Sequence, residues 1–322
     1  MINVFRPHFD HPKTSTGALD TVESLTRDVH LKPIHSHNDY WRKRPLLDAL
    51  LYGCVSVEGD IWHFKEDYTV GDTITATTLK FLSDEMYVGH NQIYLKPENT
   101  LDKVYFDPMF SFLESANKEF SVPILENFNA KFGLFYDAPE IPLYFWLDLK
   151  TEGTDIYAHL KKYLSRFIDK DYLAFYDHET GTMLPGPVII TLTGNVPWDV
   201  LNNETETTNR YVYADCPLHE FLGAGDDKMK KFKKTCVFVS ASLEQLLGKE
   251  SYQTAVRGDF SDEQQAKLKQ IFDVAHENGI KTRIWGGVDW PIHVRDSHWT
   301  TLWRLGCDLI NADDLAAAAN IF

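Results

Sequence analysis

Along most of the chain, short apolar runs alternate with stretches in which apolar residues recur at helical spacing. Compact apolar runs bounded by turn residues predict buried strands, and a period near 3.6 predicts amphipathic helices. Strands are predicted at residues 33–38, 55–62, 143–150, 188–193, 211–216, 237–240, 282–285 and 308–311. Helices are predicted at residues 44–51, 156–167, 262–278 and 298–305, and the last two end beside Gly279 and Gly306, a usual C-cap signal.

Eight strands that alternate with helices predict a parallel sheet covered by helices, and eight is the number of strands that closes a barrel. The alternative is an open, doubly wound sheet. No glycine-rich phosphate-binding loop follows the first predicted strand, which disfavours that alternative. The predicted fold class is therefore α/β, a (β/α)8 TIM barrel.

The predicted domain organisation is an N-terminal arm followed by one barrel. Residues 1–32 are polar and weakly patterned, whereas residues 33–322 hold all eight predicted strands. Two long insertions, 63–105 and 106–142, follow the second strand. Long loops after barrel strands usually build or cover the active-site mouth, so we expect these insertions to shape the site.

Composition supports a large folded core and limits the kinds of partner. The 322 residues are 43% apolar and 13% aromatic, and 32 basic against 47 acidic residues leave a net charge of −15. Such a surface repels nucleic-acid backbones, so nucleic-acid binding is not expected. The same charge weakens the case for permanent docking on anionic lipid but is compatible with transient membrane contact.

Nothing in the sequence predicts export or membrane insertion. The first residues lack the apolar stretch of a signal peptide, and no run is long and apolar enough to span a bilayer, so a cytoplasmic location is expected. The four cysteines have no C-x-x-C spacing and lie in or near apolar runs, so we expect them to be reduced and buried. They are Cys54, Cys216, Cys236 and Cys307.

Acidic residues lie near the ends of the second and third predicted strands. Glu58 and Asp60 are two residues apart, as are Asp148 and Lys150, so each pair faces one side of its strand. The C-terminal ends of barrel strands converge on one mouth, which would gather the three carboxylates there. Like charges at close range must share protons or bind a cation, and oxygen ligands suit Mg²⁺ or Ca²⁺. One such divalent cation is the predicted cofactor.

Histidines at the end of the first predicted strand add acid–base groups to this mouth. His35 and His37 project to the same side of the strand. A cation and Lys150 beside histidines could neutralise a phosphoryl group while imidazoles move protons. Each pattern alone is common at ordinary strand ends, so the inference depends on their occurrence on the first three strands together. Trp285, at the end of the seventh strand, could pack a substrate or cap the core.

These residues resemble a known family. The stretches from Pro33 to Leu46, Gly53 to Trp62 and Val88 to Asn91, with later matches at 190–195 and 281–286, are similar to the fungal altered-inheritance-of-mitochondria protein family. That family belongs to the phospholipase-C-like phosphodiesterase superfamily, with the glycerophosphodiester phosphodiesterases and sphingomyelinase D enzymes. The resemblance implies a TIM barrel with phosphodiesterase chemistry.

The resemblance also implies roles for individual residues. Glu58, Asp60 and Asp148 would hold the cation, and His90 would be the second catalytic histidine. Lys150 would contact phosphate, and Trp285 would correspond to the aromatic residue of strand seven. Asn38 is the third residue predicted to bind substrate. The first catalytic histidine is His35 or His37, because relatives have only one histidine there. Asn38-Asp39 replaces the Arg-Gly that follows this histidine in glycerophosphodiesterases, which leaves the substrate open.

The predicted function is phosphodiester cleavage by a metal-dependent hydrolase, or by a lyase that forms a cyclic phosphate, with two histidines as acid and base. Glycerophosphodiesters, lysophospholipids and sphingolipid phosphodiesters all suit such a mouth, which places the enzyme in lipid metabolism. The alternative is a barrel that binds a phosphorylated lipid or metabolite without cleaving it. An isomerase or aldolase would need a Schiff-base lysine or more histidine ligands. The sequence does not predict the oligomeric state.

Overall fold

The computed structural model describes residues 19–72, 77–118, 131–203 and 209–322. The predicted N-terminal arm lies largely outside the described residues, and its last part holds helix α1 (Val22–Thr26). Within the described ranges, no helix is both long and apolar enough to cross a membrane.

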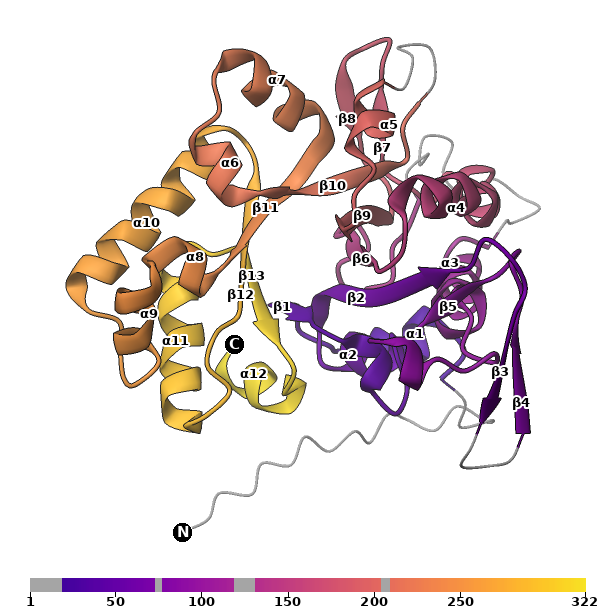
Figure 1. Cartoon of the computed structure of the whole chain (residues 1–322), viewed down its shortest axis with the longest axis horizontal. Helices are drawn as coiled ribbons and strands as arrows, with labels where there is room; N and C mark the ends of the chain where they lie inside the picture. Colours follow the sequence, from indigo (N-terminus) through magenta and orange to yellow (C-terminus); the bar gives the residue numbers. More distant parts are fainter. Residues whose placement is uncertain (1–18, 73–76, 119–130, 204–208) are drawn as a thin grey trace.

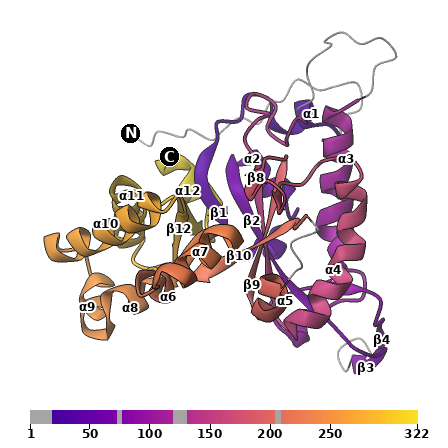
Figure 2. The same cartoon turned by 90° about the horizontal axis from the view of Figure 1, so that it is seen from above.

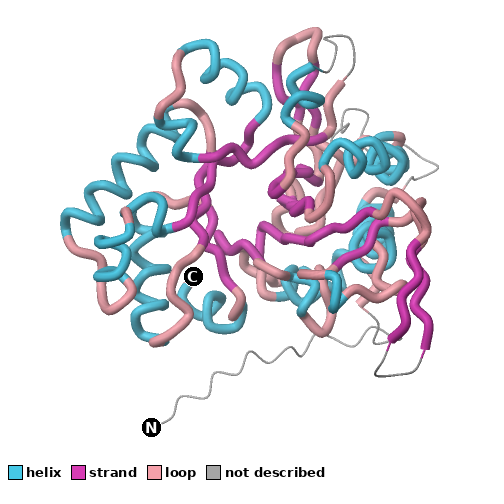
Figure 3. The backbone as a smooth tube through the Cα atoms, in the orientation of Figure 1, coloured by secondary structure: helices cyan, strands magenta, loops and turns pink. Residues whose placement is uncertain are grey.

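Eight parallel strands form a closed barrel, as predicted. They are β1 (Lys32–Ser36), β2 (Cys54–His63), β6 (Leu143–Leu149), β9 (Val188–Gly194), β10 (Val212–Pro217), β11 (Cys236–Ser242), β12 (Lys281–Trp285) and β13 (Leu309–Ala312). The strands pair in this order, and β1 closes the ring by pairing with both β2 and β13. Figure 3 shows the strands as a ring with helices outside it.

Helices cover the barrel on its outer side. The described helices after the first are α2 (Leu47–Leu51), α3 (Asp107–Ala116), α4 (Gly153–Ile168), α5 (Trp198–Asn203), α6 (Leu218–Leu222), α7 (Asp226–Thr235), α8 (Leu243–Leu247), α9 (Lys249–Ala255), α10 (Asp262–Glu277), α11 (Ile292–Leu305) and α12 (Leu315–Ile321). Helices α3 and α4 lie on the side of the barrel opposite α9 and α10 (Figures 1 and 2). Three of the four predicted helices match α2, α4 and α10, whereas α11 begins six residues earlier than predicted.

Smaller elements extend the loops. The segment after β2 contains a hairpin of β3 (Tyr68–Asp72) and β4 (Thr77–Phe81) that projects from the barrel (Figure 1). It continues through β5 (Met86–Val88), which pairs antiparallel with β2, and the short helical turns η2 (Gln92–Tyr94) and η3 (Asp102–Phe106). A short 3-10 turn, η1 (Asp39–Trp41), follows β1. A second hairpin, β7 (Phe175–Asp177) with β8 (Thr182–Leu184), precedes β9.

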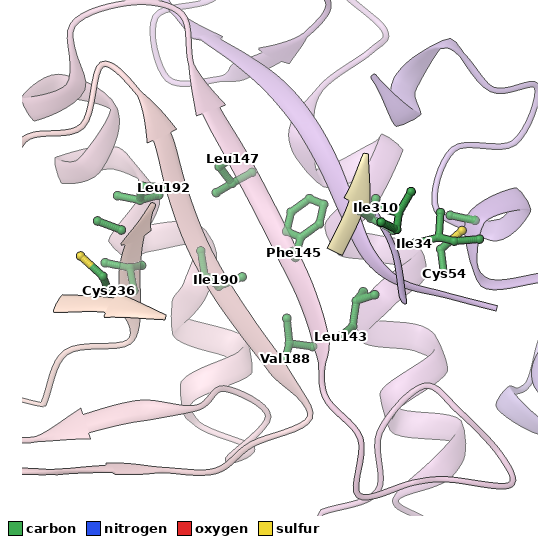
Figure 4. Packing of buried hydrophobic residues seen from close by; sticks show 14 of the residues in the cluster. Ile34, Cys54, Leu143, Phe145, Leu147, Val188, Ile190, Leu192, Cys236 and Ile310 are labelled. Carbon is green, nitrogen blue, oxygen red and sulfur yellow. The ribbon is translucent and has the colours of Figure 1, made fainter. Parts of the chain in front are cut away.

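Alternation along the strands separates the hydrophobic layer from the interior of the barrel. Leu143, Phe145 and Leu147 of β6 belong to the large buried cluster that includes the helices (Figure 4). Successive side chains of a strand point to opposite faces, so Trp146 and Asp148 point inward. Trp146 joins a separate interior cluster with Phe238 and Leu309. The apolar interior cluster and the polar strand ends therefore share the inside of the barrel.

One expectation about the cysteines is wrong. Cys216 on β10 and Cys236 on β11 form a disulfide, with their Cα atoms 5.8 Å apart. The two strands are neighbours in the barrel, which brings together residues that a spacing of 20 along the chain does not identify as a pair. Cys54 and Cys307 are free and buried, as expected.

Candidate active site

Strand pairing places the acidic residues of β2 and β6 side by side. Asp60 and Asp148 are register partners in the parallel pair, and Glu58 lies one inward-facing position earlier on β2. Gly59, between the two β2 acids, faces outward, where an added Cβ would lie 2.8 Å from the ring of Tyr105. The sequence Glu-Gly-Asp therefore allows close packing behind the strand while it presents two carboxylates to the interior.

Lys150 bridges Asp60 and Asp148. Its Nζ atom lies 2.9 Å from Asp60 Oδ2 and 2.6 Å from Asp148 Oδ2. Burial acts to lower the pKa of Lys150, but the negative charges of Asp148 and Asp60 outweigh it and the pKa is raised. Burial and the charges of Asp148 and Glu58 raise the pKa of Asp60 despite the ammonium group beside it. The three carboxylates are thus close enough to repel one another.

His90 and Tyr40 complete the surroundings of Asp60. The Tyr40 hydroxyl donates to Asp60 Oδ2 at 2.8 Å, and His90 Nδ1 lies 3.3 Å from the same oxygen. The Tyr40 oxygen is also 3.1 Å from His90 Nδ1. The ring of Trp41 lies 5.1 Å from the imidazole of His90, centroid to centroid. His90 is 45% exposed, so its other nitrogen is open to a ligand in the mouth.

The second carboxylate of β2, Glu58, is held by a buried guanidinium. Arg283 Nη2 lies 3.5 Å from Glu58 Oε1 and 2.6 Å from Asn311 Oδ1, and its guanidinium packs over the ring of Trp146. Burial would raise the pKa of Glu58, but the charge of Arg283 and the hydrogen bond with His35 hold it well below its ordinary value. Glu58 is therefore ionised at neutral pH.

The two histidines at the C-terminal end of β1, His35 within the strand and His37 just after it, differ sharply in environment. His35 is fully buried, with Nδ1 2.7 Å from Ser56 Oγ and Nε2 3.5 Å from Glu58 Oε2. Burial, helped by the charge of Arg283, lowers the pKa of His35 to about 3, so its imidazole is neutral. This ring packs inside the barrel and has no access to a ligand in the mouth.

His37 is 31% exposed, and its Nδ1 atom lies 2.9 Å from Asp313 Oδ1. Its Nε2 atom lies 3.7 Å from Glu58 Oε2. Burial acts to lower the pKa of His37, but the hydrogen bond to Asp313 and the charge of Glu58 outweigh it, and the pKa is raised. The geometry of His37, unlike that of His35, suits proton transfer with a ligand.

The remaining substrate-binding candidates lie at the rim. Asn38 adopts a left-handed backbone conformation, φ 49°, and is buried. Its backbone N–H lies 3.4 Å from Glu58 Oε2, and its side-chain oxygen contacts the Tyr40 hydroxyl. Trp285 ends β12 and is 42% exposed. The structure therefore brings eight of the nine predicted site residues into one contact network, whereas Trp285 lies at the end of β12, which pairs with β11 and β13.

The three predicted ligands of a divalent cation are Glu58, Asp60 and Asp148. In the described ranges, no three His, Cys, Asp or Glu side chains are arranged as they stand to hold a metal ion. The ammonium group of Lys150 occupies the bridging position between two of the three predicted ligands. The donor chemistry nevertheless suits a hard cation, because all three groups are carboxylates. The negative charges of Asp148 and Glu58 raise the pKa of Asp60, and a cation would relieve this repulsion.

Three contributors to the network were not found from the sequence. Tyr40 lies within the stretch that carries the family resemblance, but its hydroxyl reaches Asp60 only through the η1 turn. Arg283 is the one charged residue of the strand predicted at 282–285, which could have indicated an inward-facing charge. Asp313 lies two residues after Asn311 on the same side of the chain as it leaves β13, and that spacing could have indicated it.

A closed eight-stranded barrel with paired carboxylates, a lysine and histidines at one mouth defines the phosphodiesterase-like class of TIM barrels. Comparison with known proteins agrees. A family model described as "AIM6-like phosphodiesterase domain" matches residues 23–81 and 78–215. The chain belongs to this family.

Curated relatives support the assignment over most of the chain. The chain is 37% identical to altered inheritance of mitochondria protein 6 of Candida glabrata over 313 residues, which cover 92% of this chain and 73% of the relative. It is 33% identical to the Saccharomyces cerevisiae protein of the same name, with 93% and 73% covered. The corresponding Eremothecium gossypii protein is 34% identical, with 92% and 72% covered.

Proposed function

We propose that this protein cleaves phosphodiesters by acid–base catalysis with His37 and His90. One observation carries the proposal: each of these two imidazoles has its Nδ1 atom beside a carboxylate, Asp313 for His37 and Asp60 for His90. A carboxylate at Nδ1 fixes the tautomer and leaves Nε2 for proton transfer. Both rings also lie near the Glu58-Gly59-Asp60 strand, so they serve one mouth.

Lys150 and the three carboxylates would each contribute to binding the phosphoryl group. Lys150, partly exposed and protonated, would neutralise a non-bridging phosphoryl oxygen. A divalent cation, Mg²⁺ or Ca²⁺, held by Glu58, Asp60 and Asp148 would supply further positive charge to the same oxygens. Asn38 would contact the phosphoryl group or its alcohol at the rim, and Trp285 would pack against the organic part.

Proton transfer is assigned from the electrostatics. The two carboxylates beside His37 raise its pKa and favour its protonated form, and in that form His37 would donate its proton to the leaving alcohol oxygen as the P–O bond breaks. His90 would accept the proton of the nucleophile as the new P–O bond forms. The nucleophile is water, or a neighbouring hydroxyl of the substrate, in which case the product is a cyclic phosphate. His35 would hold Glu58 in place and take no part in proton transfer.

The charge of the site and its exposed aromatic residue indicate the substrate class. A single anionic diester matches one lysine and one ion, and the exposed Trp285 suits an organic headgroup or chain. Glycerophosphodiesters, lysophospholipids and sphingolipid phosphodiesters remain the proposed substrates, acted on by a phosphoric diester hydrolase in lipid metabolism.

Turnover of bis-p-nitrophenyl phosphate with Mg²⁺ or Ca²⁺ tests the proposal. His90→Asn and Glu58→Gln should each lower kcat by at least about a hundredfold. His219→Asn, which changes an exposed histidine of α6, is the matched control and should leave kcat unchanged. Full activity in both site variants would refute the mechanism. Tight binding of a lysophospholipid with no product from the unmodified protein would identify a non-catalytic barrel instead.

A further inference from the structure

A groove of about 680 Å³ adjoins the candidate active site and carries an unusual charge. It lies between the η1–α2 segment and the segment from β5 to α3. We call it the basic groove and define it by Lys43, Arg44, Lys96 and Lys103, with Tyr40 and Trp41 at the end nearest the site. Among the described residues, no Asp or Glu lines it, although the chain carries a net charge of −15.

Three of these cations are available to a ligand. Lys43, Lys96 and Lys103 are exposed, and among the described residues none of them has an ion-pair partner. Arg44 is held by Asp48 at 2.8 Å. The nearby guanidinium of Arg42 donates to the backbone carbonyls of His37 and Ala312, so it serves the fold. The groove thus retains several uncompensated ammonium groups in an acidic protein.

The basic groove is continuous with the active site through two aromatic residues. Tyr40 lines the groove, and its hydroxyl donates to Asp60. Trp41 lines it as well and packs near His90. Gly89, another lining residue, immediately precedes His90. A molecule bound at His90 and Lys150 can therefore extend past these rings into the groove.

We propose that the basic groove binds a phosphomonoester group carried by the phosphodiester substrate. The inference rests on the proposed function and narrows it to diesters with a second, dianionic group. Several lysines around one groove match a dianion better than a single carboxylate, and lysine binds phosphate as a point charge. The exposed rings of Trp41 and Tyr94, 57% and 58% exposed, would pack the organic part between the two phosphates.

A pair of soluble substrates tests this directly. Glycerophosphoinositol and the same diester with one additional ring phosphate differ only in the group that the groove would bind. We expect kcat/KM to be about tenfold higher for the phosphorylated diester at low salt and the preference to shrink as salt is added. Equal kcat/KM for the two diesters would overturn the proposal.

The triple variant Lys43→Gln, Lys96→Gln, Lys103→Gln should lose this preference and keep its turnover of unphosphorylated glycerophosphoinositol. The matched control changes three exposed lysines of α7, Lys230→Gln, Lys233→Gln, Lys234→Gln, and should keep the preference. Retention of the preference in the groove variant would also overturn the proposal. So would binding of phosphatidylserine vesicles that depends on the groove lysines without any preference among soluble diesters, because that outcome assigns the groove to a membrane surface.

Calorimetry separates this proposal from the proposed function. If neither diester is cleaved, catalysis fails but the groove can still be tested by binding. Tighter binding of the phosphorylated diester to the unmodified protein, lost in the groove variant, would support the groove without catalysis. Equal binding of both diesters would refute the groove as well.

Discussion

The Nδ1 atom of His37 lies 2.9 Å from Oδ1 of Asp313, although 276 positions separate the two residues along the chain. Their contact exists because β1 pairs with β13 when the barrel closes. The carboxylate raises the pKa of His37 against the opposing effect of burial. The proposed general acid is therefore tuned by the last strand of the barrel.

Replacement of Asp313 should move the pH dependence of turnover. In Asp313→Asn the negative charge is lost, so the pKa of His37 should fall and its proton should be lost at lower pH. We expect the alkaline limb of the kcat/KM profile to move down by about one pH unit. The measurement is a pH series with a diester substrate on both proteins. An unchanged alkaline limb would show that His37 is not the group that titrates there.

Replacement of His35 and of His37 in turn should separate catalysis from stability. His37→Asn should lower kcat by at least about a hundredfold with little change in Tm, because the side chain is partly exposed. His35→Ala should instead reduce the free energy of unfolding by about 3 kcal/mol, because it opens a cavity and leaves Ser56 unpaired. Kinetics and urea denaturation of both variants test this. A stable but inactive His35→Ala protein would show that His35, and not His37, is the catalytic histidine.

The contrast between these histidines also shows what sequence could and could not predict. Alternation along a strand is a local property, so the sequence predicts that Glu58 and Asp60 share one side of their strand and that His35 and His37 share one side of theirs. Burial of a side chain depends on its depth below the mouth of the barrel, and this depth is fixed only once the eight strands have closed. The sequence therefore could not tell the buried His35 from the partly exposed His37.

The other differences from prediction have two causes, exposed strands and partners far apart in the sequence. All eight barrel strands were located, because buried parallel strands are compact apolar runs. The β7–β8 hairpin was not predicted, because the side chains of β8 are exposed and give no apolar run. Arg283 acts through Glu58 on β2, and Asp313 through His37 after β1. Such pairings appear only when the register of the whole barrel is known.

Removal of the charge on Glu58 should destabilise the protein. Arg283 is buried, and Glu58→Gln would remove the carboxylate that lies 3.5 Å from its guanidinium. We expect the free energy of unfolding to fall by about 3 kcal/mol. The double variant Glu58→Gln, Arg283→Met should recover part of that loss, since no buried charge is left unpaired. Urea denaturation of the single and double variants provides the comparison. If the losses in the free energy of unfolding simply add, Glu58 and Arg283 do not stabilise the protein as an ion pair.

Asp215 should make stability depend on pH near neutrality. Burial raises its pKa to about 7, against the opposing hydrogen bond with Ser240. The folded state thus holds this proton more tightly than the unfolded state, whose pKa is near 3.8. The associated stability is fully present below pH 3.8 and is lost as pH rises through 7.

Asp215→Asn should therefore flatten the pH dependence of stability. Between pH 5 and 8 the unmodified protein should lose roughly 2 kcal/mol more than the variant, because the partly buried carboxyl must ionise. Thermal denaturation at several pH values measures the difference. Parallel profiles of stability against pH for the two proteins would show that Asp215 does not cause the pH dependence.

Metal dependence can be tested through Lys150. If a divalent cation binds Glu58, Asp60 and Asp148, chelation should abolish turnover and added Mg²⁺ or Ca²⁺ should restore it. In Lys150→Met the competing ammonium group is gone, so the cation should bind at least about tenfold more tightly, while kcat falls for lack of a phosphate contact. Calorimetric titration with each cation measures affinity apart from activity. Undiminished turnover after exhaustive chelation would exclude the cation.

The closing position of β1, between β2 and β13, has a consequence for biosynthesis. During translation the first seven strands leave the ribosome with an unpaired edge at β1 and another at β12, and such edges invite association with other chains. The site is equally incomplete at that stage, because His37 still lacks Asp313. A nascent chain should thus be both inactive and prone to aggregation until β13 is made, and chaperones that shield open sheets should matter most at that moment.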